Sequence, residues 1–419
     1  MIPVGELIYR ALKGEKELNL LRARLTYAFA PWEVNKEQKE TKEPDLEEYR
    51  GLFLEDEMVG NYILYPFEHR LGGKRISVGG IGGVASPPEN RYKGYISEIL
   101  KRGLAEMRQR GMSLSTLWPR STLYPFYAKM GWAVGGETTR YEIDIDRLKF
   151  LDRPESGRFV PIDLDDYHSL MGVFEEWTRY HDFTMVRTDS WWQHRIIHRW
   201  GMTPVIYGWE DNGELQGYMI FRFAQTEKQV EIRVWEFAYK TPEAYRSLLH
   251  FAAVHSSQVG QVHLTGPADD PIFYMLEDAA PDRGLKVERR PGHMVRVVDV
   301  ATAVKEIGLP GQSRPGAVSG SSPEGSFSLA VTDKQAPWNN GQFLVAVTGD
   351  GVSCSRVSDT PRDNADIALT IGQLSQLITG FRSLRDLADW NGVAVPSADA
   401  ARLASQLWPK RSIFMTEPF

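Results

Sequence analysis

Residues 79–95 read GGIGGVASPPENRYKGY, and they form the most informative segment of the sequence. A glycine-rich strand pattern leads into a turn with two prolines, and a basic segment that contains Gly94 then begins a helix. Free N–H groups at a helix N-terminus and the helix dipole attract anions. Gly94 has no Cβ that would keep a pyrophosphate from the backbone, and Arg91 and Lys93 add positive charge. The stretch therefore predicts an anion-binding cradle.

The glycines at 79–83 fit two other phosphate motifs poorly. They lie near the end of the expected strand, and no helix follows them directly as in a dinucleotide-binding fingerprint. The Gly-Lys-Ser/Thr of a nucleotide P-loop is also missing. Taken alone, Arg91-x-x-Gly94 marks an ordinary helix start more often than a phosphate site, so its interpretation depends on the surrounding sequence.

Strand and helix patterns alternate on both sides of this stretch. Apolar side chains recur on one face from Tyr95 to Arg110, which predicts a helix that Gly111 ends. The turn at Leu71-Gly72-Gly73 predicts a hairpin. The other elements expected before residue 150 are a helical segment at 7–29 interrupted at Gly14, strands at 51–55, 59–65, 74–86 and 114–118, and a short helix at 124–130.

The rest of the chain has the same mixture of patterns, which suggests a weak internal duplication. From 157 to 295 we expect a helix at 163–177, a hairpin around Asp211-Asn212-Gly213, strands at 230–239 and 262–264, and a helix at 242–255. Further on we expect strands at 294–300, 326–332, 341–347 and 351–356, and helices at 301–307, 370–377 and 400–407. Residues 309–325 are rich in Gly, Ser and Pro, which predicts a long loop.

A second motif follows the strand expected at 114–118, where residues 126–132 read FYAKMGW. Together with residues 91–96, RYKGYI, it resembles the GCN5-related N-acetyltransferase (GNAT) superfamily. That family has a pyrophosphate motif Arg/Gln-x-x-Gly-x-Gly/Ala and a later FY-x-x-x-GF element. Ile96 departs from the small final residue of the first motif. The resemblance implies mixed central sheets with flanking helices, and acetyl-CoA as the cosubstrate.

The whole chain resembles one branch of this superfamily, the Eis-like (enhanced intracellular survival) N-acetyltransferases. That branch has an N-terminal GNAT domain, a second, degenerate GNAT domain, and a C-terminal domain like sterol carrier protein. The resemblance implies an α+β chain with domains at 1–150, 151–293 and 294–419, the last of which supplies its terminal carboxylate. It also implies a homo-oligomer, often a hexamer.

The resemblance assigns residues to the steps of acetyl transfer. An amine attacks the thioester and CoA thiolate leaves, so a base for the ammonium and a proton donor for the sulfur both help. The resemblance implies Tyr127 as the acid and the terminal carboxylate of Phe419 as the base; Tyr124 stays an alternative acid, and a packing role stays open for Tyr127 and Phe419. The residues expected to hold acetyl-CoA are Val84, Ala85 and Ser86 along the pantetheine arm, through backbone groups, and Arg91, Tyr92, Lys93, Gly94, Tyr95 and Ile96 around the pyrophosphate.

Other reactive side chains have simpler explanations. His194 and His198 have the i, i+4 spacing of a zinc site, but no His-Glu-x-x-His motif accompanies them, so we expect an ordinary helix face and no metal. Trp191-Trp192 indicates packing or an interface. Cys354 fits a small core residue, because direct attack by the amine needs no protein nucleophile.

Composition excludes several classes of protein. A net charge of −6 disfavours general nucleic-acid binding, and the single cysteine excludes an internal disulfide. We find no apolar run long enough to span a membrane and no signal-peptide pattern in residues 1–21, so we expect a cytoplasmic protein. Asp45, Glu47 and Glu48 would suit an acidic mouth for cationic substrates, although a solvated loop is the simpler explanation.

The resemblance implies an enzyme that moves an acetyl group from acetyl-CoA to a primary amine. The resemblance implies acceptors of aminoglycoside, polyamine or lysine type, on a small molecule or a peptide. The alternative is a non-catalytic protein that binds CoA or an apolar ligand in its sterol-carrier-like domain. The intact Arg91, Gly94 and Tyr127 count against that alternative.

Overall fold

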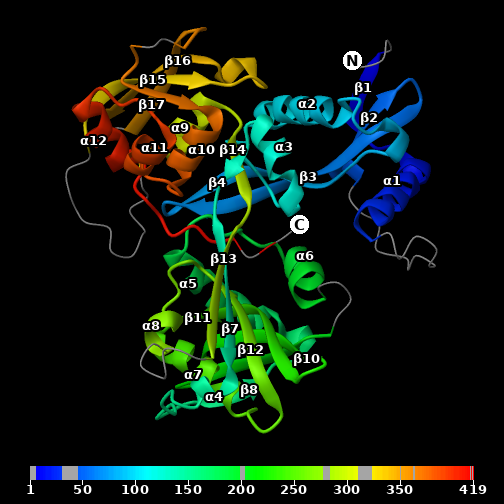
Figure 1. The fold of residues 1–419 in the computed structure, drawn as a ribbon, viewed down its shortest axis with the longest axis vertical. Helices are drawn as coiled ribbons and strands as arrows, with labels where there is room; N and C mark the ends of the chain where they lie inside the picture. The colour runs from blue at the N-terminus through cyan, green and yellow to red at the C-terminus, as the bar shows by residue number, and fades with distance from the viewer. Residues whose placement is uncertain are drawn as a thin grey trace.

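The computed structural model describes residues 6–30, 46–198, 203–276, 284–309, 323–349, 351–361, 364–415, 417 and 419. Two seven-stranded sheets and one four-stranded sheet organise these residues. Figure 1 shows the units built on the first and third sheets next to each other, with the unit of the second sheet below them. The architecture is the predicted α+β class with mixed sheets and flanking helices.

The first sheet has the strand order β1-β2-β3-β4-β5-β14-β6. Its strands are β1 (Leu7–Ala11), β2 (Tyr49–Leu54), β3 (Glu57–Leu71), β4 (Lys74–Ala85), β5 (Leu114–Leu117), β14 (Met294–Val297) and β6 (Ala133–Val134). Its helices are α1 (Gly14–Phe29), α2 (Tyr95–Gln109) and α3 (Tyr124–Lys129). The expected hairpin is confirmed, because Gly72 and Gly73 both have positive φ angles in the turn between β3 and β4.

The helical segment expected at 7–29 is partly wrong. Residues Leu7–Ala11 form a strand that pairs antiparallel with β2, and the helix begins only at Gly14. Apolar residues at the edge of a sheet can have the same spacing as a helix face, so the pattern alone did not separate the two. The hydroxyl group of Tyr9 in β1 hydrogen-bonds to Tyr62 and Glu106, which fixes this edge strand against α2.

The second sheet has the strand order β13-β7-β12-β11-β10-β9-β8. Its strands are β13 (Leu285–Pro291), β7 (Glu137–Asp144), β12 (Val259–Gly266), β11 (Val230–Tyr239), β10 (Glu214–Gln225), β9 (Val205–Asp211) and β8 (Arg158–Pro161). Its helices are α4 (Ile145–Leu148), α5 (His168–Trp177), α6 (Asp189–Trp191), a π-helix (Trp192–Ile197), α7 (Pro242–Ala253) and α8 (Ile272–Leu276). The hairpin at Asn212-Gly213 is confirmed, since both residues have positive φ angles.

The duplication is visible in one repeated strand–helix–strand segment. In the first sheet β4 runs through α2 to the parallel strand β5, and in the second sheet β11 runs through α7 to the parallel strand β12. The expected boundaries near residues 150 and 293 stay predictions about separate domains. The hydrogen-bonded sheets divide the chain elsewhere, because β7 pairs with β12 and β13 while β14 returns to the first sheet between β5 and β6.

The third sheet has the order β17-β16-β15-β18. Its elements are β15 (Gly325–Thr332), β16 (Gly341–Thr348), β17 (Gly351–Ser358), β18 (Ile367–Thr370), α9 (Val300–Ile307), α10 (Ile371–Thr379), α11 (Leu384–Asn391) and α12 (Ala398–Leu407). The strand expected at 294–300 ends at Val297, and α11 was not expected. Most of the loop expected at 309–325 lies outside the described residues.

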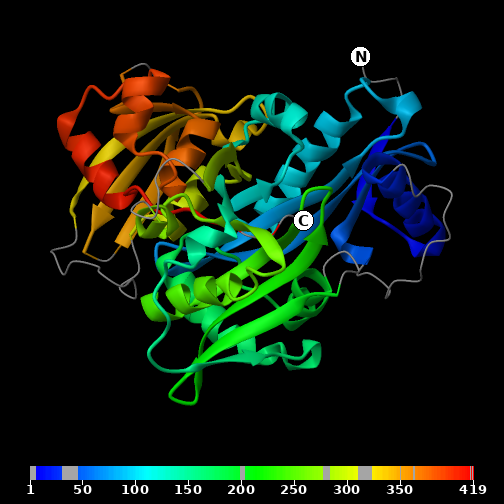
Figure 2. The ribbon, with the colours of Figure 1, turned by 60° about the horizontal axis from the view of Figure 1, so that its bottom comes forward.

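One continuous core joins the third unit to the first. Val78 and Val295 of the first sheet belong to the same cluster of buried side chains as Phe327 and Leu374 of the third unit. A buried ion pair of 2.6 Å between Arg296 and Asp333 crosses the same boundary. The third unit is therefore fixed against the first sheet, and the chain that follows it begins from a defined position. Figure 2 shows the C-terminus returning to the middle of the molecule, where the units meet.

Candidate active site

Strand β4 diverges from its neighbour β5 and leaves part of its edge unpaired. The two strands pair only from Val78–Leu114 to Ile81–Leu117, whereas β4 continues to Ala85. On the other side, the register with β3 shifts by one residue around Gly83, which has a φ angle of 56°. Such a bulge bends a strand. The backbone groups of Gly82 to Ala85 on the β5 side can therefore pair with an extended ligand.

The turn after β4 presents free backbone donors. Gly94 is the N-cap of α2 with a φ angle of 89°, and no side chain of the described chain caps this end. The first N–H groups of a helix have no partner within it, so those that follow Gly94 point into the open. Tyr92, with a φ angle of 62°, has a fully exposed side chain, and Lys93 Nζ donates to Asn90 Oδ1 at 3.1 Å.

The equivalent turn of the second unit is closed. There the side chain of Thr241 accepts a hydrogen bond from Ala244 N at 3.1 Å, and Pro242 is the first residue of α7. Since its own N-cap occupies the donors that α2 leaves free, this turn is less suited to an anion. The turn predicted to bind an anion is therefore uncapped before α2 in the first unit, whereas the equivalent turn before α7 in the second unit is capped.

The residues expected to hold CoA lie between the unpaired edge of β4 and the uncapped N-terminus of α2. Ala85 and Tyr95 are buried, and Val84 and Ile96 pack against the core cluster under α2. Ser86 Oγ donates to Val59 O at 3.1 Å, so its side chain is occupied and its backbone carries any ligand contact.

Arg24 of α1 is a candidate that sequence reasoning missed. Its guanidinium Nη1 is buried and has no hydrogen-bond partner among the described residues. Burial lowers its pKa, while the nearby carboxylates of Glu89 and Glu57 act in the opposite direction. Tyr27, on the same helix, has its ring 6.0 Å from the Arg91 guanidinium. Arg24 thus lies close to the predicted cradle, although no sequence motif connects it with residues 91–96.

The two tyrosines of α3 differ in what their hydroxyl groups contact. Tyr124 OH donates to the carbonyl oxygen of Gly292 at 2.5 Å and lies 3.1 Å from that of Pro291. No described residue hydrogen-bonds to the hydroxyl of Tyr127, whose ring packs against Phe126 and Trp132. Burial raises the pKa of Tyr127 to about 12, so it is protonated at neutral pH. Tyr127 is consequently the better placed of the two to donate to a ligand.

Phe419 lies against strand β4. A Cβ on Gly82 would lie 3.4 Å from the carboxyl carbon of Phe419, and a Cβ on Gly80 would lie 3.2 Å from its ring. The ring makes edge contacts with Tyr65 at 5.6 Å and Phe67 at 4.8 Å between centroids. Gly80 and Gly82 of β4, which fit no nucleotide motif, therefore leave space for Phe419 and its aromatic neighbours.

A buried charge network holds the chain segment that leads to Phe419. Glu417 accepts a hydrogen bond from Arg187 Nε at 2.6 Å, and the same guanidinium makes two bonds to Glu236. Upstream, the backbone of Asp182 bonds to both Ser412 and Phe414. The segment is thus fixed to the second unit just before it reaches the first, and Figure 1 shows the C-terminus between these two units.

Tyr127 and Phe419 lie on opposite faces of β4. Ile81 points to the face under α2, where Tyr127 belongs to the same core cluster. Gly82, the next residue, points to the other face, towards Phe419. A ligand that entered between β4 and β5 beyond Ile81 would therefore have Tyr127 on one side and Phe419 on the other.

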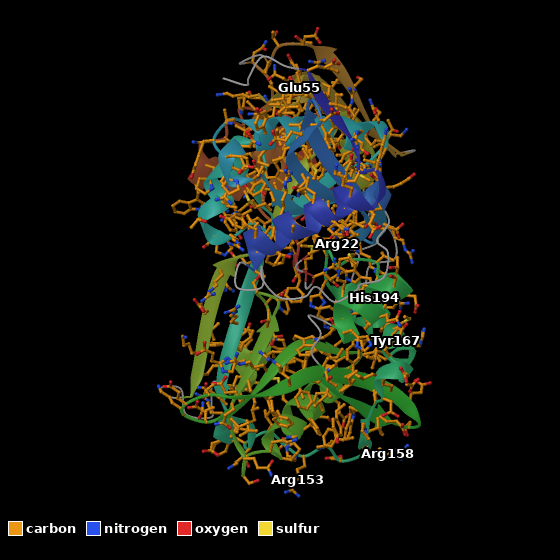
Figure 3. All side chains as sticks on the ribbon, turned by 90° about the vertical axis from the view of Figure 1, so that its right-hand side faces the viewer. Arg22, Glu55, Arg153, Arg158, Tyr167 and His194 are labelled. Carbon is orange, nitrogen blue, oxygen red and sulfur yellow. The ribbon has the colours of Figure 1, made fainter. Side chains whose placement is uncertain are left out.

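An open groove of about 590 Å³ lies beside Phe67, between the first and second units. Residues from the first unit that line it are Glu48, Tyr65, Pro66, Phe67, Glu68 and Arg75, and those from the second are Met185, Val186, Arg187, Thr188, Ser190, Trp191, His194 and Arg195. Tyr65 and Phe67 of the groove wall also contact the ring of Phe419, so the end of the chain lies next to this wall. Figure 3 labels His194 on the part of the second unit that faces the first.

Other residues singled out in the sequence lie either in the wall of the groove or in the interior of the protein. Trp191 is a wall of the groove and Trp192 is buried behind it, while Asp45 lies outside the described residues. His194 is exposed, with Nδ1 2.9 Å from Ser190 O. Burial raises the pKa of Cys354 in β17 to about 12.

The described residues lack two kinds of feature. They contain no group of three or more His, Cys, Asp or Glu side chains that could hold a metal ion. None of the described helices is long and apolar enough to cross a membrane.

Family comparisons match the three units separately. Residues 9–135 match an acetyltransferase (GNAT) domain, and residues 184–297 match a second model of the same description. Residues 310–416 match a sterol carrier protein domain.

Whole-chain comparisons agree with this order of domains. An N-acetyltransferase of Streptomyces avermitilis is 24% identical over 379 residues, which cover 85% of this chain and 84% of the relative. A probable N-acyltransferase from Enterococcus faecalis superposes with a TM-score of 0.81 at 23% identity, covering 99% of this chain and all of the other. Eis1 from Mycobacterium abscessus superposes with a TM-score of 0.76 at 20% identity, with the same coverage of both chains. At these identities the superpositions establish the fold.

Proposed function

Because this chain is an Eis-like N-acetyltransferase of the GNAT superfamily, we propose that it transfers the acetyl group of acetyl-CoA to a primary amine. The acceptor would be of aminoglycoside, polyamine or lysine type, as the sequence resemblance implies. The single observation that carries the proposal is the close approach of the carboxyl group of Phe419 to strand β4, next to Tyr65 and Phe67 of the groove wall.

The residues around β4 and α2 fit acetyl-CoA as a substrate. The uncapped N-terminus of α2 after Gly94 suits a diphosphate, and Arg91 and Arg24 provide positive charge beside it. The unpaired edge of Gly82 to Ala85 suits the amides of the pantetheine arm. When bound, acetyl-CoA would supply a thioester carbonyl that an amine can attack.

The base in this proposal is the carboxylate of Phe419. An amine of lysine type is mostly ammonium at neutral pH, since its ordinary pKa is about 10.4. The carboxylate would take one proton from the ammonium as the acceptor nitrogen approaches the carbonyl carbon, and the free amine then forms the new N–C bond while the C–S bond breaks. The second proton that the nitrogen loses would replace the one that the acid gives to the sulfur. The Arg187–Glu417 pair, two residues earlier, would keep the carboxylate in position.

The acid in this proposal is Tyr127. Its raised pKa keeps the hydroxyl protonated at neutral pH, and no described residue competes for that hydrogen. The hydroxyl would donate to the leaving sulfur, which lowers the cost of the negative charge that develops there. Tyr124 is the weaker candidate because backbone carbonyls of the loop before β14 already accept its hydrogen bond.

A thiol-release assay tests the proposal. Purified protein would be mixed with acetyl-CoA and, in turn, kanamycin, spermidine, a lysine peptide and 6-aminohexanoate. We expect release of CoA that depends on the amine, and mass spectrometry should find the product heavier by one acetyl group. Tight binding of CoA without turnover on any amine would instead favour the non-catalytic ligand-binding protein.

Two further properties belong to the proposal. We extend to this chain the cytoplasmic location that the sequence predicts and the homo-oligomeric state, often hexameric, that the Eis-like resemblance implies. Light scattering of the purified protein would test the second property, because a monomeric mass at micromolar concentration would contradict it.

A further inference from the structure

Among the described residues that line the groove between the first and second units, one arginine has no carboxylate within 4.0 Å. Arg75 pairs with Glu68 at 3.1 Å, and Arg187 pairs with Glu236 and Glu417. Arg195, on the π-helix at Trp192–Ile197, has no carboxylate within 4.0 Å anywhere in the described chain, and this includes Glu48 on the same groove. Its guanidinium is exposed to the groove and keeps donors free for a ligand.

Aromatic contacts hold this guanidinium in position. Arg195 Nη2 donates to Tyr65 OH at 3.2 Å, and its Cζ lies 5.4 Å from the ring of Trp191 and 6.0 Å from that of Tyr65. Contacts with ring faces orient the planar group without neutralising its charge. A pre-oriented guanidinium beside apolar walls is suited to a planar carboxylate.

Tyr65 connects this cation with the proposed base. The Cβ position of Gly82 is 2.9 Å from Tyr65 Cε2 and 3.4 Å from the carboxyl carbon of Phe419. The hydroxyl at the far end of the same tyrosine is the acceptor for Arg195. Because Cε2 and the hydroxyl group are both attached to Cζ, the anionic Phe419 carboxylate and the cationic Arg195 lie near the same outer end of the Tyr65 ring.

We propose that the acceptor of this enzyme carries a carboxylate at the end opposite its amine, and that Arg195 binds that carboxylate. A lysine-like molecule such as 6-aminohexanoate carries an amine for the first group and a carboxylate for the second, and its apolar chain would pack against Tyr65, Phe67 and Trp191. One unbalanced guanidinium matches a single negative charge better than a phosphate dianion. This inference rests on the proposed function and narrows its acceptor class.

Three acceptors of equal length separate the possibilities: 6-aminohexanoate, 6-aminohexanamide and 1,6-diaminohexane. We expect kcat/KM to be at least about tenfold higher for the carboxylate than for the amide, and lowest for the diamine. In R195Q the ratio of carboxylate to amide should fall towards one, whereas R195K should keep part of it. R158Q, which changes an exposed arginine of β8 that pairs with Glu210, is the matched control and should leave the ratio unchanged.

The outcomes distinguish this inference from the proposed function. If the amide or the diamine is acetylated as well as the carboxylate, the inference is overturned and the proposed function stands. If no amine is acetylated, the proposed function fails. Calorimetry then still tests whether Arg195 binds a carboxylate. In that case 6-aminohexanoate should bind to wild-type protein at least about tenfold more tightly than to R195Q, and equal affinity would overturn the inference.

Discussion

The carboxyl carbon of Phe419 lies 3.4 Å from the point at which a Cβ of Gly82 would stand. The contact depends on glycine at this position of β4, because the same Cβ would approach Tyr65 Cε2 to 2.9 Å. The proposed base and the strand that would bind the thioester arm therefore touch without an intervening side chain.

The first prediction concerns this contact. In G82A the new methyl group should displace Tyr65 and Phe419, and kcat should fall by up to about a hundredfold because the base is misplaced by around an ångström. Affinity for CoA, measured by calorimetry, should change little. G172A in α5 is the control, since an added Cβ has no neighbour within 4 Å there among the described residues, and it should keep wild-type turnover. Wild-type kcat in G82A would contradict the prediction.

Sequence reasoning recovered the elements whose side-chain pattern is local. The helix Tyr95–Gln109 and the hairpin of β3 and β4 follow from apolar periodicity and paired glycines. It failed for Leu7–Ala11, whose strand state depends on pairing with β2. It also gave no sign that β14 returns to the first sheet, because pairing between distant segments leaves no local pattern.

The residues of the candidate site also differ in whether a local sequence pattern reveals them. Gly94 and Tyr127 belong to motifs of contiguous residues, so the sequence exposes them. Arg24, Arg195 and Glu417 come from three distant parts of the chain and meet the site only through tertiary packing. Arg195 in particular follows Trp191-Trp192, for which the sequence suggested only packing or an interface.

The second prediction separates the two tyrosines. Y127F should lower kcat by about a hundredfold or more, because the leaving sulfur loses its proton donor, with little change in the melting temperature. Y124F should instead lose its bond to Gly292 and about 1 kcal/mol of stability, with kcat within a few-fold of wild type. Steady-state kinetics and thermal unfolding measure both effects. The reverse pattern of rates would move the acid role to Tyr124.

The third prediction concerns the anchor of the C-terminal segment. E417A leaves Arg187 Nε without its acceptor in a buried site, which should cost about 1–3 kcal/mol of unfolding free energy. It should also lower kcat, because Phe419 loses its support. E417Q keeps an oxygen that can accept from Arg187, so its kcat should stay closer to wild type. Equal kcat in wild type, E417A and E417Q would show that this pair does not position Phe419.

The fourth prediction is a loss of stability in acid. Burial lowers the pKa of His69 from its ordinary value of 6.5 to about 4, and that of His293 to about 3. Below pH 6.5 the unfolded chain binds protons that the folded chain does not, so the stability present above pH 6.5 decreases as the pH falls towards 4 and then 3.

Urea unfolding between pH 7 and 4.5 measures this effect. H293F keeps the stacking on Phe183, whose ring lies 4.8 Å from that of His293, and should show a shallower loss of stability than wild type. H198Q, which changes an exposed histidine, should follow the wild-type curve. Identical slopes for H293F and wild type would contradict the prediction.

The carboxylate of Phe419 is tested most directly by kcat in two variants, one without Phe419 and one with a glycine appended after it. Each should lose at least about a hundredfold in kcat at pH 7 while CoA binds within a few-fold of wild type, and the loss should shrink as the pH approaches the pKa of the amine, where no base is needed. If the extended chain kept wild-type kcat at pH 7, the carboxylate of Phe419 would not be the base.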